Sequence, residues 1–136
     1  MVGYIKAYLI TFIIFFLIDL LWLGLIAKSL YRKHIGFLLK DNFNMPIAII
    51  FYMVFIGGLI FFVINRAASI NSWQYALFAG MLFGFITYST YDITNLATLK
   101  NWPVAITIID IIWGTVLCGT TSIISYKIIN HFNILK

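Results

Sequence analysis

Three aspartates lie inside the long apolar stretches of this 136-residue chain, where acidic side chains are rare. Asp19, Asp92 and Asp110 each interrupt such a stretch, whereas the fourth acid, Asp41, lies in a polar segment. One aspartate at the centre of a membrane-crossing helix costs about 2.5–3.5 kcal/mol. We therefore expect the three carboxylates to face one another, other polar groups or a water-filled cavity, where they could bind a proton or a cation.

The three aspartates are also predicted to reach the same half of the membrane. At a rise of about 1.5 Å per residue, Asp19 lies about 12 Å before the end of its predicted helix. Asp110 lies about 10 Å beyond the start of its helix, and Asp92 lies about 7 Å before the end of its helix. Carboxylates that share a desolvated site cannot all ionise, so we expect at least one to be protonated near neutral pH.

Polar and aromatic residues accompany the aspartates on the same predicted helix faces. Residues three, four and seven positions apart share one face of a helix, and Tyr88, Tyr91, Asp92 and Asn95 have this spacing. The pattern Asp-x-x-Trp occurs twice, ending at Trp22 near the membrane surface and at Trp113 deeper in the bundle. The predicted ligand- and proton-binding residues are Asp19, Asp92, Asp110, Asn95, Tyr88, Tyr91, Trp22 and Trp113.

The helices that hold these residues are predicted from a composition typical of a multi-pass membrane protein. The chain is 63% hydrophobic and 10% charged, against about 25% charged residues in a soluble domain. A span needs about 20 mostly apolar residues. Four windows meet this length, and they predict an all-α, integral membrane four-helix bundle that forms a single domain over residues 1–136; the windows are Ala7–Ala27, Met45–Ile64, Trp73–Ala97 and Pro103–Tyr126.

Small and polar residues predict how the last two helices pack. Gly80 and Gly84 lie one helical turn apart and let another backbone approach closely. A stripe of small or polar residues surrounds Asp110 on the fourth predicted helix, namely Thr107, Gly114, Cys118, Thr121, Ser122 and Ser125. We expect these faces to meet in the interior of the bundle.

The segment between the first two predicted spans has the pattern of a short amphipathic helix at the membrane interface. Its apolar residues fall on one side at helical spacing and its cations fall elsewhere, a pattern typical of helices that lie on lipid headgroups. The apolar positions are Tyr31, Ile35, Leu38 and Leu39. Trp102, just before the fourth predicted helix, is expected to anchor the chain at the interface.

The charge distribution predicts a location but fixes no orientation. A net charge of +5 on so apolar a chain indicates contact with anionic lipid and gives no argument for nucleic acid. Four spans place both termini on one side, with four cations there and five on the other. This small difference favours a cytoplasmic first loop, and an antiparallel homodimer stays open as an alternative.

The residue types present exclude several classes of enzyme. The two histidines, His34 and His131, lie outside the predicted spans, which excludes a multi-histidine di-iron centre and a bis-histidine haem. Motifs of serine hydrolases, zinc proteases and phosphate-binding loops do not occur. We predict no metal and no cofactor.

The motifs along the whole chain resemble a family of small bacterial membrane proteins, domain-of-unknown-function family 2177. The similar segments are Asp19-x-x-Trp22-Leu-Gly24, Phe51-Tyr52 with Gly57-Gly58, "YDITNLATLKNWP" and "DIIWG". The resemblance implies a four-span protein of the bacterial inner membrane and supplies no activity.

Three hypotheses of function follow from the residues. The first is binding or transport of a small cationic or amphipathic ligand, linked to a proton or cation, with Asp19 and Asp110 as exchange sites. In this hypothesis Asp92 and Asn95 form the mouth, and the tyrosines and tryptophans form aromatic walls. The second is a cofactor-free acid/base enzyme on lipid or isoprenoid substrates, and the third is an accessory subunit of a membrane complex. We expect binding or transport rather than catalysis.

Overall fold

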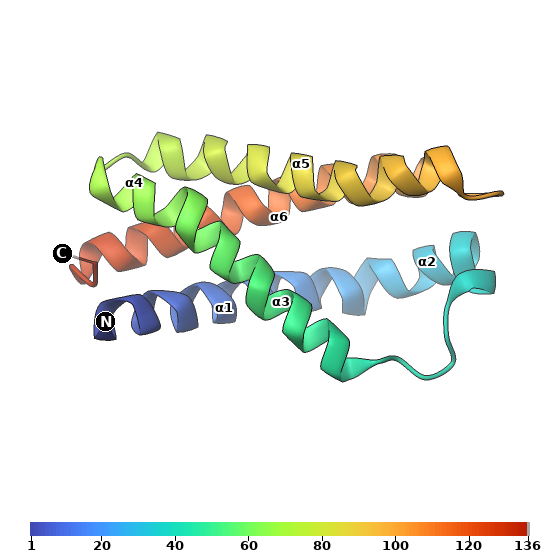
Figure 1. Cartoon of the computed structure of the whole chain (residues 1–136), viewed down its shortest axis with the longest axis horizontal. Coiled ribbons are helices and arrows are strands. Elements are labelled where there is room, and N and C mark those ends of the chain that lie inside the picture. The colour runs from blue at the N-terminus through green and yellow to red at the C-terminus, as the bar shows by residue number, and fades with distance from the viewer. Residues whose placement is uncertain (136) are drawn as a thin grey trace.

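The computed structural model describes residues 1–135, which form helices and short turns (Figure 1). The first helical segment is continuous from Val2 to Leu38. It consists of α1 (Val2–Trp22), the π-helical turn η1 (Leu23–Ala27), α2 (Lys28–Ile35) and the 3-10 turn η2 (Gly36–Leu38). At about 1.5 Å per residue this segment is about 55 Å long, so it exceeds the roughly 30 Å hydrocarbon core of a bilayer.

Three further helical segments follow, of which the first runs obliquely across the others (Figure 1). The second segment comprises α3 (Met45–Leu59), η3 (Ile60–Ile64) and α4 (Asn65–Ser69), and it is followed by α5 (Trp73–Thr98) and α6 (Val104–His131). Both termini lie at the same end of the bundle, where a Cβ on Gly3 would overlap the backbone of Ile134.

Local sequence explains where these helices begin and end. The side chain of Asn44 accepts a hydrogen bond from the Ile47 amide, and Ser72 accepts one from the Tyr75 amide. Three asparagines with positive φ lie at or beyond helix ends, a conformation that asparagine tolerates better than most residues; they are Asn71, Asn101 and Asn133.

Within residues 1–135, three helical segments are long and apolar enough to cross a membrane: Val2–Leu38, Met45–Ser69 and Val104–His131. The all-helical class and these three membrane-capable segments confirm the sequence-based expectation. α5 matches the remaining predicted span in length, but its polar residues keep it out of this group. The count of four spans therefore stays a prediction.

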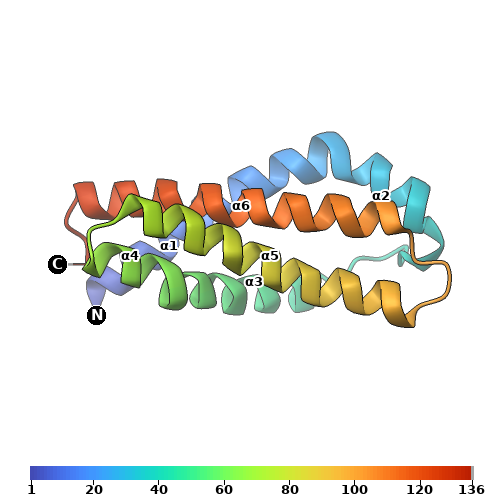
Figure 2. The ribbon, with the colours of Figure 1, turned by 90° about the horizontal axis from the view of Figure 1, so that it is seen from above.

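α5 and α6 lie side by side over most of their length (Figure 2). A Cβ on Gly84 would overlap the Gly114 carbonyl, and one on Gly80 would come within 2.8 Å of the Cys118 carbonyl oxygen. The six small or polar residues predicted to line α6 are all buried. The glycines thus bring the two backbones close together, and the polar face of α6 is covered.

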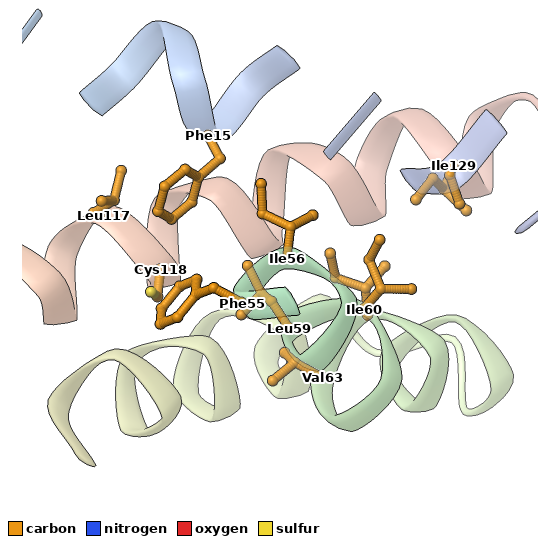
Figure 3. Close-up of a cluster of buried hydrophobic side chains, with 11 residues drawn as sticks. Phe15, Phe55, Ile56, Leu59, Ile60, Val63, Leu117, Cys118 and Ile129 are labelled. Carbon is orange, nitrogen blue, oxygen red and sulfur yellow. The ribbon is translucent and has the colours of Figure 1, made fainter. Parts of the chain in front are cut away.

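The apolar core lies where α1, α3, η3 and α6 meet (Figure 3). Phe15, Ile56, Leu59 and Leu117 are at most 1% exposed there. Large apolar side chains elsewhere on the helices are exposed, among them Leu17, Val54, Phe78 and Ile112, which is the distribution of a chain whose outer surface faces lipid.

The segment after the first span differs from its prediction. Residues 28–35 are helical, but they continue the first helix through the π-helical turn instead of forming a separate helix. Ile35 packs with Trp102 and Ile106, with Tyr31 beside them. Trp102 is only 8% exposed and its indole N–H donates to the Thr107 hydroxyl, so it covers the end of the bundle rather than facing lipid.

Candidate functional site

Asp19 is held by two side chains from other helices. The Tyr52 hydroxyl on α3 donates to one carboxylate oxygen at 2.9 Å, and the Trp113 indole N–H on α6 donates to the other at 3.4 Å. Asp19 itself is 6% exposed. Three helices therefore converge on one carboxylate, which satisfies a charge that would otherwise be costly to bury.

Trp22 and Trp113 stack face to face beside this carboxylate. Their ring centroids are 4.5 Å apart and their planes differ by 9°. Each tryptophan follows its aspartate by about one helical turn. Because α1 and α6 run in opposite directions, the stacked pair lies between Asp19 and Asp110. The three residues from each aspartate to its tryptophan, at about 1.5 Å per residue on both helices, put Asp19 and Asp110 about 9 Å apart along the bundle.

Asp110 has a different partner at the other side of the tryptophan pair. The Tyr31 hydroxyl on α2 donates to its carboxylate at 2.5 Å, and Asp110 is 7% exposed. The π-helical turn η1 lies between Asp19 and Tyr31, so it sets the direction in which Tyr31 leaves the helix. The unusual continuity of α1 and α2 is therefore what brings Tyr31 to α6.

Asp92 on α5 is completely buried, and neither carboxylate oxygen has a hydrogen-bond partner. The indole N–H of Trp22 and the hydroxyl of Ser89 are also buried without a partner. An isolated buried charge is far more costly than a neutral polar group. Protonation would remove the charge and give Asp92 a donor.

The three predicted acids differ in their hydrogen-bond partners. Asp19 and Asp110 each face an aromatic hydrogen-bond donor, and Asp92 faces none. Within residues 1–135, no group of three or more Asp, Glu, His or Cys side chains is arranged to hold a metal ion. Asp92 lies near enough to Asp110 for their charges to interact, and both act on Tyr31, whereas the tryptophan pair lies between Asp110 and Asp19.

An aromatic groove of about 460 Å³ lies beside Tyr52, the hydrogen-bond partner of Asp19. We call it the aromatic groove, and its lining residues are Phe15, Phe51, Tyr52, Phe55, Thr87, Tyr88 and Tyr91. At its edges Phe51 and Tyr91 are 58% and 60% exposed, so the groove opens towards the outer surface of the bundle. Tyr52 belongs to both features, because its ring lines the groove and its hydroxyl binds Asp19.

The remaining predicted residues lie around this groove and at the end of α5. The ring of Tyr88 lies over Gly114, where a Cβ would overlap it. Tyr91 makes an edge-to-face contact with Trp102, at a centroid distance of 5.9 Å. Asn95 is half-buried one turn beyond Asp92.

Two tyrosines that hold the carboxylates were not among the predicted site residues. Tyr52 appears in the sequence as part of a Phe-Tyr pair in an apolar helix, and Tyr31 appears on the apolar side of an expected interfacial helix. The sequence does hold a signal that could have identified these two tyrosines. A tyrosine in a membrane helix needs a hydrogen-bond partner for its hydroxyl, and buried aspartates are the acceptors available.

A comparison with known protein families matches residues 4–127 to the family described as "Predicted membrane protein (DUF2177)". The chain belongs to this family. Neither the curated proteins nor the solved structures include a match. Family membership and the three apolar segments together place the protein in a lipid bilayer.

Proposed function

We propose that this protein binds a small lipophilic cation in the aromatic groove and exchanges it for protons held by buried aspartates. The observation that carries the proposal is the double role of Tyr52, which connects the groove to the Asp19 carboxylate. The setting is the bacterial inner membrane, with α5 as the fourth span and both termini on one side.

The groove has the chemistry that a lipophilic cation needs. Its rings supply apolar contact, and the face of an aromatic ring attracts a cation within about 6 Å of its centre. Asp19 supplies a negative charge behind Tyr52, and a proton on the same carboxylate would remove that charge. Because Phe51 and Tyr91 are exposed at the edges, a ligand would reach the groove sideways from the lipid.

Asp92 and Asp110 provide proton sites nearer the end of the bundle that holds the first loop. Asp92 is buried without a donor for its carboxylate, a state that favours a bound proton. Asp110 is paired with Tyr31 on the other side of the tryptophan pair from Asp19. Protons would pass between this end and Asp19 by way of these groups.

Purified protein in liposomes that contain a pH-sensitive dye tests the proposal. Tetraphenylphosphonium, a lipophilic cation, should cause a proton flux in the wild type that Asp19→Asn lowers at least about tenfold, or about 1.4 kcal/mol in the coupled step. Asp41→Asn is the matched control, because this exposed loop aspartate lies outside the site. Equal flux in wild type, Asp19→Asn and empty liposomes would overturn the proposal.

A further inference from the structure

A second groove extends from the end of the bundle where the termini meet, and it shares no lining residue with the aromatic groove. It has a polar part of about 500 Å³, lined in part by Tyr4, Asn65, Arg66, Ser69 and Asn130. An apolar part of about 400 Å³ adjoins it and includes Tyr8, Gly57 and Ile60. The two parts share Tyr4, Phe61 and Asn65, so they form one feature, which we call the terminal groove.

The length of the terminal groove corresponds to one leaflet of a membrane. Arg66 lies in α4 near the end of the second helical segment, and Gly57 lies about 13 Å further into the helix at 1.5 Å per residue. Half of a bilayer's hydrocarbon core is about 15 Å thick. The polar part therefore lies at headgroup depth when the apolar part lies among the acyl chains.

The charges at this end of the protein favour an anion. Lys6, Arg66 and Lys127 lie on the helix ends here, and the nearest acid along α1, Asp19, is about 22 Å from Tyr4. The guanidinium of Arg66 presents five N–H donors in a fork that matches a phosphate. Asn65, Tyr4 and Ser69 add polar groups around it.

The apolar part has room for a chain of methylene groups. A Cβ placed on Gly57 would meet no atom within 4 Å, so the helix surface is bare at this point. Ile60 and Phe61 line the groove beside it. A phosphate group above and an acyl chain below would fill both parts together.

We infer that the terminal groove binds one anionic phospholipid, with its phosphate on Arg66 and one acyl chain over Gly57. Basic pockets between membrane helices are a known setting for anionic headgroups. This site is independent of the proposed exchange of cations and protons, since it shares no residue with the aromatic groove.

Native mass spectrometry of protein taken from phosphatidylcholine vesicles with a minor fraction of phosphatidylglycerol tests the inference. The wild type should retain phosphatidylglycerol in preference to phosphatidylcholine. Arg66→Gln should weaken this retention about fivefold, the effect of one cation near a membrane surface. Lys127→Gln removes a cation at the same end that does not line the groove, so it should leave retention unchanged.

A second pair of variants tests the acyl chain separately from charge. Gly57→Leu should fill the apolar part, starting from a position where a Cβ meets no protein atom, and should lower retention. Gly24→Leu, at another bare helix position outside both grooves, should not lower it. Equal loss in Arg66→Gln and Lys127→Gln, or displacement of the lipid by inorganic phosphate alone, would overturn the inference.

Photocrosslinking of the unmodified chain guards against variants that fail to fold. Phosphatidylglycerol with a photoreactive acyl chain should label the segment from Gly57 to Arg66. Labelling confined to other segments would overturn the inference even if Arg66→Gln and Gly57→Leu were both unstable.

Discussion

At the scale of single residues, the buried carboxylates differ in what surrounds them. Asp19 and Asp110 each accept a hydrogen bond from a tyrosine that is distant in sequence, whereas Asp92 has no donor. A hydrogen bond to a charged group contributes about 1.5–3 kcal/mol, and a donor left unpaired costs about 1–3 kcal/mol. The three aspartates should therefore respond differently to the same substitution.

Leucine has nearly the shape of aspartate but accepts no hydrogen bond. Asp19→Leu should lower the thermal midpoint by at least about 5 °C, because the Tyr52 hydroxyl and the Trp113 indole lose their acceptor. Asp92→Leu should keep the midpoint or raise it, because no hydrogen bond is lost. Circular dichroism in detergent measures both midpoints, and a larger loss in Asp92→Leu would contradict the structure.

The sequence predicted the buried residues better than it predicted which residues contact one another. The spacing on α5 and α6 predicted that Gly84, Asp92 and Asp110 lie on inward faces, and these residues are buried. The Tyr31–Asp110 and Trp22–Trp113 contacts depend on how α1, α2 and α6 cross. Helix periodicity gives the face of a side chain and not its partner.

At the scale of helices, α5 depends on its neighbour more than the other long helices do. It is less apolar overall than the three membrane-capable segments, and its glycine face lies directly on α6. Gly84→Leu should therefore push the α5–α6 pair apart and cost at least about 1–3 kcal/mol, the usual cost of overfilling a packed site. Gly24→Leu, at a bare position on the first helical segment, is its control in a thermal unfolding measurement.

The helix boundaries show which local signals the sequence carries. The starts at Met45 and Trp73 agree with the predicted windows because Asn44 and Ser72 cap these helices. The break expected after Ala27 is absent, because charged residues can continue a helix beyond the lipid without ending it. Hydropathy therefore predicted which part of the first helical segment is apolar enough to lie in the membrane. It did not predict the residue at which the helix ends.

At the scale of the whole molecule, the arrangement predicts which surface positions share a side of the membrane. With Cys118 changed to serine, single cysteines at Asn42 and Lys100 should react with an impermeant maleimide from one side. Cysteines at Ile70 and Phe132 should react from the other. All four positions are exposed in turns or at helix ends. Reaction of the Ile70 and Lys100 positions from the same side would mean that α5 does not cross.

The meeting of the two termini at one end has a consequence for building linked pairs of this protein. Because Gly3 packs against Ile134, a short flexible linker can join the last residue of one copy to the first residue of a second copy without crossing lipid. With the four proposed spans, such a tandem chain forces both copies to insert in the same direction. Full activity in the tandem chain would identify the parallel arrangement or the single copy as the working unit, and an inactive but folded tandem chain would favour the antiparallel pair.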